Sequence, residues 1–171
     1  MKISITPFCF ALYVAASQAG AQDAGAVNGT QFGDWQLVCV AEAVNQTSCG
    51  LVQSIVENTS QSFVAEIAIN RIEVEGLVRG LLSVRTPTSM LLTERPAYRV
   101  GDSGEVHALE WRTCSSEFCS AVRLLSSDEL EELAQDGPVV FGYQPITTAE
   151  PVNFAGSLSG LAEGLNALGF E

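Results

Sequence analysis

The chain holds few side chains that could carry acid–base or nucleophilic chemistry. His107 is the only histidine, so a mechanism that moves a proton on an imidazole must use it. It lies in an extended run with Glu105 on the same strand face and Glu110 on the opposite face. A small hydrolase that uses His107 and one of these carboxylates is therefore an open alternative. Because a mid-strand histidine is more often an ordinary sheet residue, we predict no catalytic residue and no enzyme.

Four cysteines lie beyond the first 21 residues: Cys39, Cys49, Cys114 and Cys119. An even number favours disulfide bonds in an exported protein, with three possible connectivities. We favour Cys39–Cys49 and Cys114–Cys119, because each pair brackets a short segment that could form the turn between neighbouring strands. Zinc ligands are usually spaced more tightly than Cys39 and Cys49, and no histidine lies near this pair. We therefore predict no metal and no cofactor.

An acidic cluster follows Ser126 and could be interpreted as a calcium-binding site. It lacks the spacing of a calcium-binding loop. On a helix that begins at Ser126, these side chains lie largely opposite Leu130 and Leu133, so we predict a solvated helix face. The cluster contains Asp128, Glu129, Glu131, Glu132 and Asp136.

The N-terminus has the order of a secretory signal peptide. Lys2 is followed by an apolar stretch over residues 7–16 and then by small residues, which predicts cleavage near Ala21. The apolar stretch is half of the roughly 20 residues that a membrane-spanning helix needs, so we expect no integral membrane span. We predict a signal peptide over residues 1–21, a flexible leader over 22–31 and one domain over 32–171.

The charge of the chain narrows its range of partners. It has eight basic and twenty acidic residues, a net charge of −12. Loss of residues 1–21 removes Lys2, the only lysine, and leaves seven arginines and a net charge of −13. Such a surface repels nucleic acid and anionic membranes, so we expect neither as a partner.

The periodicity of the apolar residues predicts short strands and two helices. The alternation over residues 62–72 and 77–86 is typical of half-buried strands, and Glu75-Gly76 marks the turn between them. Ser126 and Glu129 form a capping-box pattern at the start of the first helix. A leucine stripe predicts a second helix that begins at Ser157. The remaining expected strands cover residues 35–39, 49–56, 97–100, 105–114, 119–126 and 139–146, with a weaker one over 90–93.

Many short strands with little helix favour an antiparallel β-sandwich. We therefore predict a mainly β fold with two short amphipathic helices, stapled by two disulfides. Trp35 and Trp111 each alternate with other apolar residues, so we place both in the core.

The order and spacing of several short motifs resemble the invasion-associated locus B family over residues 32–169. These motifs are Gly33-Asp34-Trp35 before Cys39, Gln53 four residues after Cys49, Thr113-Cys114 before Cys119-Ser120-Ala121, Leu130 and Leu133 before Gly137, and Val152 to Gly160 before the last helix. The resemblance implies an immunoglobulin-like β-sandwich with structural cysteine pairs, exported by an alphaproteobacterium. It brings no catalytic residue.

From the resemblance and the missing catalytic motifs we predict a non-enzymatic envelope or surface protein that acts through protein contacts, in host-cell interaction or envelope maintenance. The expected location is the periplasm, the outer membrane by association, or the exterior. The expected partner is a protein of the envelope or of a host cell. Besides the His107 hydrolase, a carrier with a small-ligand pocket between the sheets remains an alternative.

Overall fold

The computed structural model describes residues 27–170 except residues 45, 136 and 149. The expected signal peptide, the cleavage point near Ala21, the first part of the expected leader and Asp136 of the acidic cluster lie outside the described residues. Within the described part, no helix is both long and apolar enough to cross a membrane.

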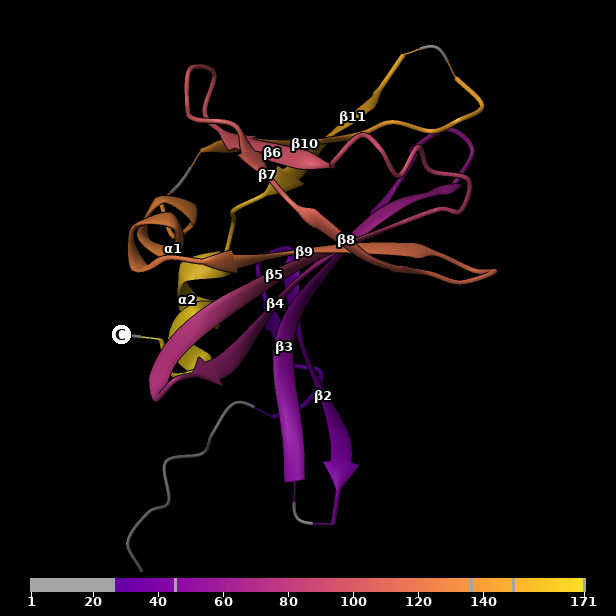
Figure 1. The fold of residues 1–171 in the computed structure, drawn as a ribbon. Helices are drawn as coiled ribbons and strands as arrows, with labels where there is room; N and C mark the ends of the chain where they lie inside the picture. Colours follow the sequence, from indigo (N-terminus) through magenta and orange to yellow (C-terminus); the bar gives the residue numbers. More distant parts are fainter. Residues whose placement is uncertain (1–26, 45, 136, 149, 171) are drawn as a thin grey trace, which may run out of the picture.

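The described strands form two antiparallel sheets, one above the other in Figure 1. The larger sheet has the order β1-β2-β3-β4-β5-β9-β8, and the smaller one has the order β11-β10-β6-β7. The strands of the larger sheet are β1 (Gln31–Phe32), β2 (Trp35–Ala43), β3 (Gln46–Val56), β4 (Phe63–Val74), β5 (Leu77–Thr86), β8 (Glu110–Cys114) and β9 (Cys119–Leu125). The strands of the smaller sheet are β6 (Ala97–Val100), β7 (His107–Ala108), β10 (Pro138–Tyr143) and β11 (Val152–Ser157).

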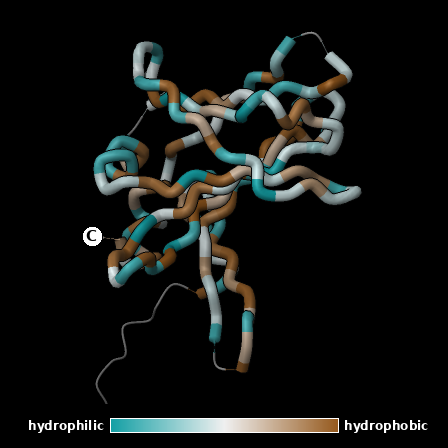
Figure 2. The backbone as a smooth tube through the Cα atoms, viewed as in Figure 1, coloured by the Kyte–Doolittle hydropathy of each residue, from teal (hydrophilic) through white to brown (hydrophobic). Residues whose placement is uncertain are grey.

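The β4–β5 hairpin shows how the sequence builds the larger sheet. Ala65, Ile67 and Ile69 alternate along β4 and are almost fully buried, while the residues between them are half-exposed. The two-residue turn at Glu75 and Gly76 has φ of 54° and 78°. Positive φ at both central residues is the requirement of the tight hairpin turn that matches strand twist. Figure 2 shows the same alternation of hydrophobic and hydrophilic residues along the strands.

The core lies between the two sheets. Trp35, Leu51 and Leu82 are at most 2% exposed, and they come from the larger sheet. From the smaller sheet, Phe141 stacks on Phe154 with ring centroids 5.5 Å apart. Trp35 thus lies in the core as expected, and Trp111 is partly buried against it.

Two short helices cover one end of the larger sheet (Figure 1). They are α1 (Ser127–Leu133) and α2 (Leu161–Ala167). The capping box predicted at Ser126 is present, with the Glu129 amide donating to Ser126 Oγ at 3.2 Å and the Ser126 amide donating to Glu129 Oε2 at 2.8 Å. The prediction that the second helix begins at Ser157 is wrong. The helix begins at Leu161, because residues 152–157 pair with β10 as β11.

Two further expectations differ from the structure. The sequence predicts a flexible leader over residues 22–31, yet the Gly29 amide donates to the Leu37 carbonyl and Gln31 pairs with Gln36. The strand expected over residues 105–114 is divided between the sheets, because His107 and Ala108 pair with β6 and residues 110–114 pair with β9. Residues 90–93 form no strand, and only Met90 makes an isolated bridge, to Pro145.

Two disulfides join neighbouring strands. Cys39–Cys49 links β2 to β3, and Cys114–Cys119 links β8 to β9, which are the pairs favoured from the sequence. The predicted fold class, mainly β with antiparallel sheets, two helices and two disulfides, is confirmed.

Candidate functional site

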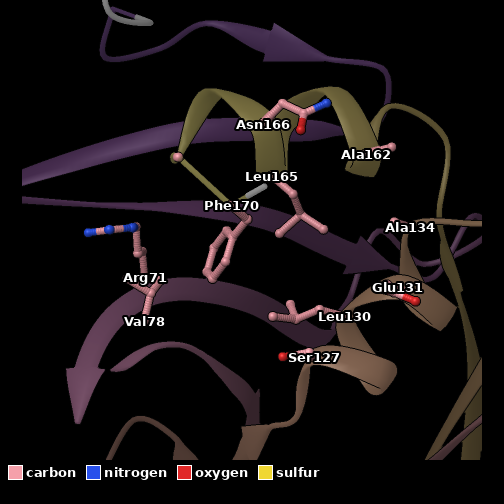
Figure 3. Close-up of a pocket in the computed structure, with 11 residues that line it drawn as sticks. Arg71, Val78, Ser127, Leu130, Glu131, Ala134, Ala162, Leu165, Asn166 and Phe170 are labelled. Atoms are coloured by element: carbon pink, nitrogen blue, oxygen red, sulfur yellow. The ribbon is translucent and has the colours of Figure 1, made fainter. Parts of the chain in front are cut away.

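An open groove lies between α1 and α2, with a volume of about 580 Å³ (Figure 3). Its floor comes from β4 and β5, and the helices form the two sides. We call this feature the groove throughout. It is lined by Arg71, Val78, Ser127, Leu130, Glu131, Ala134, Ala162, Leu165, Asn166, Gly169 and Phe170.

Two glycines allow the helices to lie close to the sheet. A Cβ at Gly80 in β5 would lie 2.9 Å from the Leu130 side chain of α1. A Cβ at Gly164 in α2 would lie 2.7 Å from the Leu51 side chain of β3. Both distances are below ordinary van der Waals contact, so a larger residue at either position would displace a helix and alter the groove.

The end of α2 places an aromatic ring in the groove. Gly169 has φ of 79°, and its amide donates to the Asn166 carbonyl at 3.0 Å. The Phe170 amide donates to the Leu165 carbonyl at 3.1 Å, which completes a glycine-based helix cap of the Schellman type. This cap folds Phe170 back toward Leu165, and the two side chains line the α2 side of the groove (Figure 3).

The groove is apolar at its centre and charged at its rim. Leu130 of α1 faces Phe170, which follows α2, across the gap, and Val78 at the floor is 42% exposed. Arg71 and Glu131 lie at opposite sides of the groove (Figure 3). An apolar surface left open in this way can bind apolar side chains of a partner.

A second feature is a polar cluster around Glu129. It is formed by Glu129, Arg123, His107 and Tyr98, and we call it the Glu129 cluster. Glu129 Oε1 accepts a hydrogen bond from Arg123 Nε at 2.6 Å and from the Tyr98 hydroxyl at 3.4 Å. The same oxygen lies 3.2 Å from His107 Nδ1. With the capping bond from Ser126, one carboxylate thereby connects α1 to strands of both sheets.

Burial, charges and hydrogen bonds shift the pKa values of Glu129, Tyr98 and Arg123. Burial alone would raise the pKa of Glu129, but hydrogen bonds from Ser126 and Arg123 outweigh it and hold this pKa below its ordinary value. Burial, and then the Glu129 charge, raise the pKa of Tyr98. Although burial opposes the charged form, the bond to Glu129 raises the pKa of Arg123. At neutral pH, Glu129 and Arg123 therefore form a charged pair.

His107 packs into the Glu129 cluster and away from the groove. Its ring stacks on Tyr98 with centroids 4.9 Å apart, and the residue is 9% exposed. Its Nε2 atom is buried without a hydrogen-bond partner, 3.8 Å from Glu132 Oε2. A general base needs a nitrogen that a substrate can reach, and His107 lines none of the described cavities.

The carboxylates beside His107 differ from those expected. Glu110 pairs with Arg95 at 2.6 Å, and Glu105 makes no hydrogen bond or ion pair to His107 in the described structure. The carboxylates that approach His107 are Glu129 and Glu132, which the sequence predicts on a solvated helix face. That placement was wrong for Glu129, whose side chain is only 12% exposed, because the sequence could not show β7 packing against α1.

Gln53 has a structural role that the sequence does not predict. It is 3% exposed, and its amide group accepts from the Ser157 amide at 2.9 Å and donates to the Ser157 carbonyl at 3.2 Å. Trp35 Nε1 donates to the same carbonyl at 2.8 Å. Trp35 and Gln53 thus fix the end of β11 just before the segment that leads into α2.

Sequence reasoning identified the helix faces of the groove but missed the groove itself. The leucine stripes point to Leu130 and Leu165, yet stripes carry no information on the gap between two helices. Arg71, Val78 and Phe170 gave no signal, because they gather only through the β4–β5 hairpin and the turn at Gly169.

Comparison with known proteins matched a protein family and solved structures. Residues 35–169 match the family described as "Invasion associated locus B (IalB) protein". The crystal structure of invasion associated protein B from Bartonella henselae superposes with a TM-score of 0.66 at 18% identity, covering 81% of this chain and 94% of that chain. At this identity the match to the crystal structure shows a shared fold. No protein with a curated description matches the sequence at a significant level.

Proposed function

Because the chain belongs to the invasion-associated locus B family, we propose that it is an exported, non-enzymatic protein of the cell envelope or surface that acts through contacts with another protein. The family is not known as an enzyme family. The partner belongs to the envelope or to a host cell, and the protein serves envelope maintenance or host-cell contact.

The observation that carries this proposal is the groove. Its volume lies within the roughly 300–1,000 Å³ of common binding pockets, and its centre is apolar. Small-ligand pockets bury about 70–90% of the ligand surface, whereas this groove is open to solvent between α1 and α2. An open groove suits a segment of a larger molecule, part of which stays in solvent. This shape favours a protein ligand over the small-ligand carrier.

The Glu129 cluster supports the non-enzymatic part of the proposal. His107 Nδ1 faces Glu129 and Arg123, and Nε2 is buried. The described residues contain no group of three or more potential metal-ligating side chains. We therefore assign the Glu129 cluster to holding α1 and propose that the protein works without a catalytic residue, metal or cofactor.

The two disulfides support export, since such bonds persist in oxidising compartments. We place the mature protein in the periplasm, at the outer membrane by association, or outside the cell, after cleavage near Ala21. Cys39, Cys49, Cys114 and Cys119 are structural in this proposal.

One observation favours a hydrolase as the second candidate. The pair of His107 Nδ1 and Glu129 Oε1, 3.2 Å apart, has the geometry of a base and the carboxylate that orients it. The burial of His107 Nε2 argues against a hydrolase, because a substrate cannot reach that nitrogen. If His107→Ala leaves every phenotype of the producing strain intact once protein levels are matched, the hydrolase is excluded.

Site-specific photo-crosslinking in the producing cell tests the main proposal. A benzophenone amino acid replaces Asn166, an exposed groove residue, or Ser116, an exposed control in the β8–β9 turn. We expect a protein adduct from position 166 and none from position 116. Ala162→Trp fills the groove and should suppress the adduct, whereas Ala167→Trp, on the same helix but outside the groove, should not. An adduct that forms equally at both positions, or that Ala162→Trp leaves unchanged, would contradict binding in the groove.

A further inference from the structure

The charges around the groove identify the chemistry of the segment that it binds. We propose that the occupant is a segment of a partner protein that carries basic residues on both sides of a few apolar anchors. This inference rests on the proposed function and concerns the same groove.

Both helices that form the groove carry acidic charge only. The charged residues of α1 are Asp128, Glu129, Glu131 and Glu132, and α2 contributes Glu163. Glu129 is paired with Arg123 inside its cluster, so it is not available to a ligand. Glu131 is exposed and lines the groove. The two helices therefore present carboxylates and no basic side chain of their own to a ligand.

One more carboxylate lies beside the floor of the groove. Glu73 pairs with Val78 across the β4–β5 hairpin. Side chains of directly paired residues stand on the same face of a sheet, so Glu73 lies beside Val78 at the hairpin end of the groove. Glu131 thus lines the groove on the α1 side, and Glu73 lies next to its floor, outside the lining residues.

Arg71 is the exception among the lining residues, and its surroundings already supply negative charge. Its Nε lies 3.8 Å from the position that a Cβ on Gly169 would take, at the C-terminal end of α2. The last carbonyl groups of a helix carry partial negative charge, and α2 has no basic residue in its last turn. Arg71 therefore lies beside the partial negative charge at the end of α2, on the opposite side of the groove from Glu131, and we assign the choice of ligand charge to the carboxylates.

The charge of the whole chain acts in the same direction. A net charge of −12, or −13 after loss of the signal peptide, attracts basic partners over a range set by the ionic strength. The apolar centre supplies contact area, while the carboxylates supply steering and discrimination between partners. Leu130, Leu165, Phe170 and Val78 receive the anchors, and the flanking basic residues reach Glu131 and Glu73.

Three synthetic peptides test this inference on the full exported chain. All three share the same leucine positions, and the remaining positions are lysine in one, glutamine in the second and glutamate in the third. Binding is followed by the backbone amide shifts of the ¹⁵N-labelled protein. We expect the lysine peptide to shift groove residues and to bind at least about tenfold more tightly than the glutamate peptide at low salt. Added salt should reduce this difference.

Two charge variants separate the local effect from the global one. Glu131→Lys changes the rim of the groove, and Glu117→Lys makes the same change of net charge in the exposed β8–β9 turn. We expect Glu131→Lys to weaken binding of the lysine peptide about fivefold. Glu117→Lys should weaken it less than twofold. Equal weakening by both variants would overturn the inference, because net charge alone would then explain the preference.

The outcomes distinguish this inference from the proposed function. Equal binding of all three peptides in the groove overturns the charge preference and leaves the groove as a protein-binding site. Tighter binding of the glutamate peptide overturns it as well. If the photo-crosslink from position 166 is absent, the proposed function fails, whatever the peptides do.

Discussion

The two sides of α1 meet different surroundings. On one side, Glu129 is bonded to Arg123, Tyr98 and the amide of Ser126, with His107 at 3.2 Å. On the other side, Leu130 faces a gap of about 580 Å³. The two sides are one residue apart in sequence.

This difference separates the structural role of the helix from its proposed binding role. A buried carboxylate whose partners all come from the same chain contributes to stability and offers nothing to a ligand. Apolar side chains that face an open gap contribute less to stability and keep contact area for a partner. His107, the only histidine, thus lies on the structural side of α1, although its residue type first suggested acid–base chemistry.

Glu129→Ala should have the largest effect on stability. It removes the partner of Arg123 and half of the capping box, so we expect a loss of about 3 kcal/mol in the free energy of unfolding. Urea denaturation followed by tryptophan fluorescence measures it. Glu131→Ala, on the groove side of the same helix, should change the free energy by less than about 0.5 kcal/mol. Similar losses in the two variants would remove the distinction between the sides of α1.

Gly164→Val should come next. The new side chain meets the Leu51 methyl groups, since a Cβ there already lies at 2.7 Å. We expect a loss of about 1.5 kcal/mol and a displaced α2, with weaker binding in the groove as a result. Thermal unfolding and amide shifts of α2 check both effects. Full stability with unchanged shifts would show that α2 does not depend on this close contact.

Acidification should weaken the Glu129 cluster selectively. Because the folded state holds the pKa of Glu129 below its unfolded value, this carboxylate stabilises the protein above about pH 4.3. That contribution is lost as the pH falls through the folded pKa. The stability difference between the unmodified protein and Glu129→Gln should therefore narrow from neutral pH to about pH 3. A difference that stays constant over this range would contradict the charged pair with Arg123.

Ala162→Trp should have the smallest effect on stability. Ala162 is exposed and lines the groove, so we expect a change below about 0.5 kcal/mol in the free energy of unfolding. The added ring should nevertheless block the lysine peptide, whereas Ala167→Trp should not. A fluorescence titration of both variants measures this difference.

The sequence correctly predicted the features that depend on residues close together in the chain. The capping box at Ser126, the turn at Glu75-Gly76 and the two cysteine pairs each join groups that lie close along the chain. The sequence also placed Trp35 in the core through strand alternation.

The predictions that were wrong or missing concern contacts between segments that lie far apart in the chain. Glu129 was expected in solvent, because an acidic helix face gives no sign that β7 and β9 will cover it. Residues 152–157 were not recognised as a strand, since their pairing with β10 outweighs the leucine stripe that suggested a helix from Ser157. The groove needs two helices, a hairpin and a C-terminal turn at once, so no single segment signals it.

The most direct test of this account compares two variants by the yield of the photo-crosslink from position 166 at matched protein levels. His107→Ala alters the Glu129 cluster, and Ala162→Trp fills the groove. We predict that His107→Ala keeps most of the adduct and that Ala162→Trp loses it. Loss of the adduct in His107→Ala with full yield in Ala162→Trp would contradict the division of α1 into a structural side and a binding side.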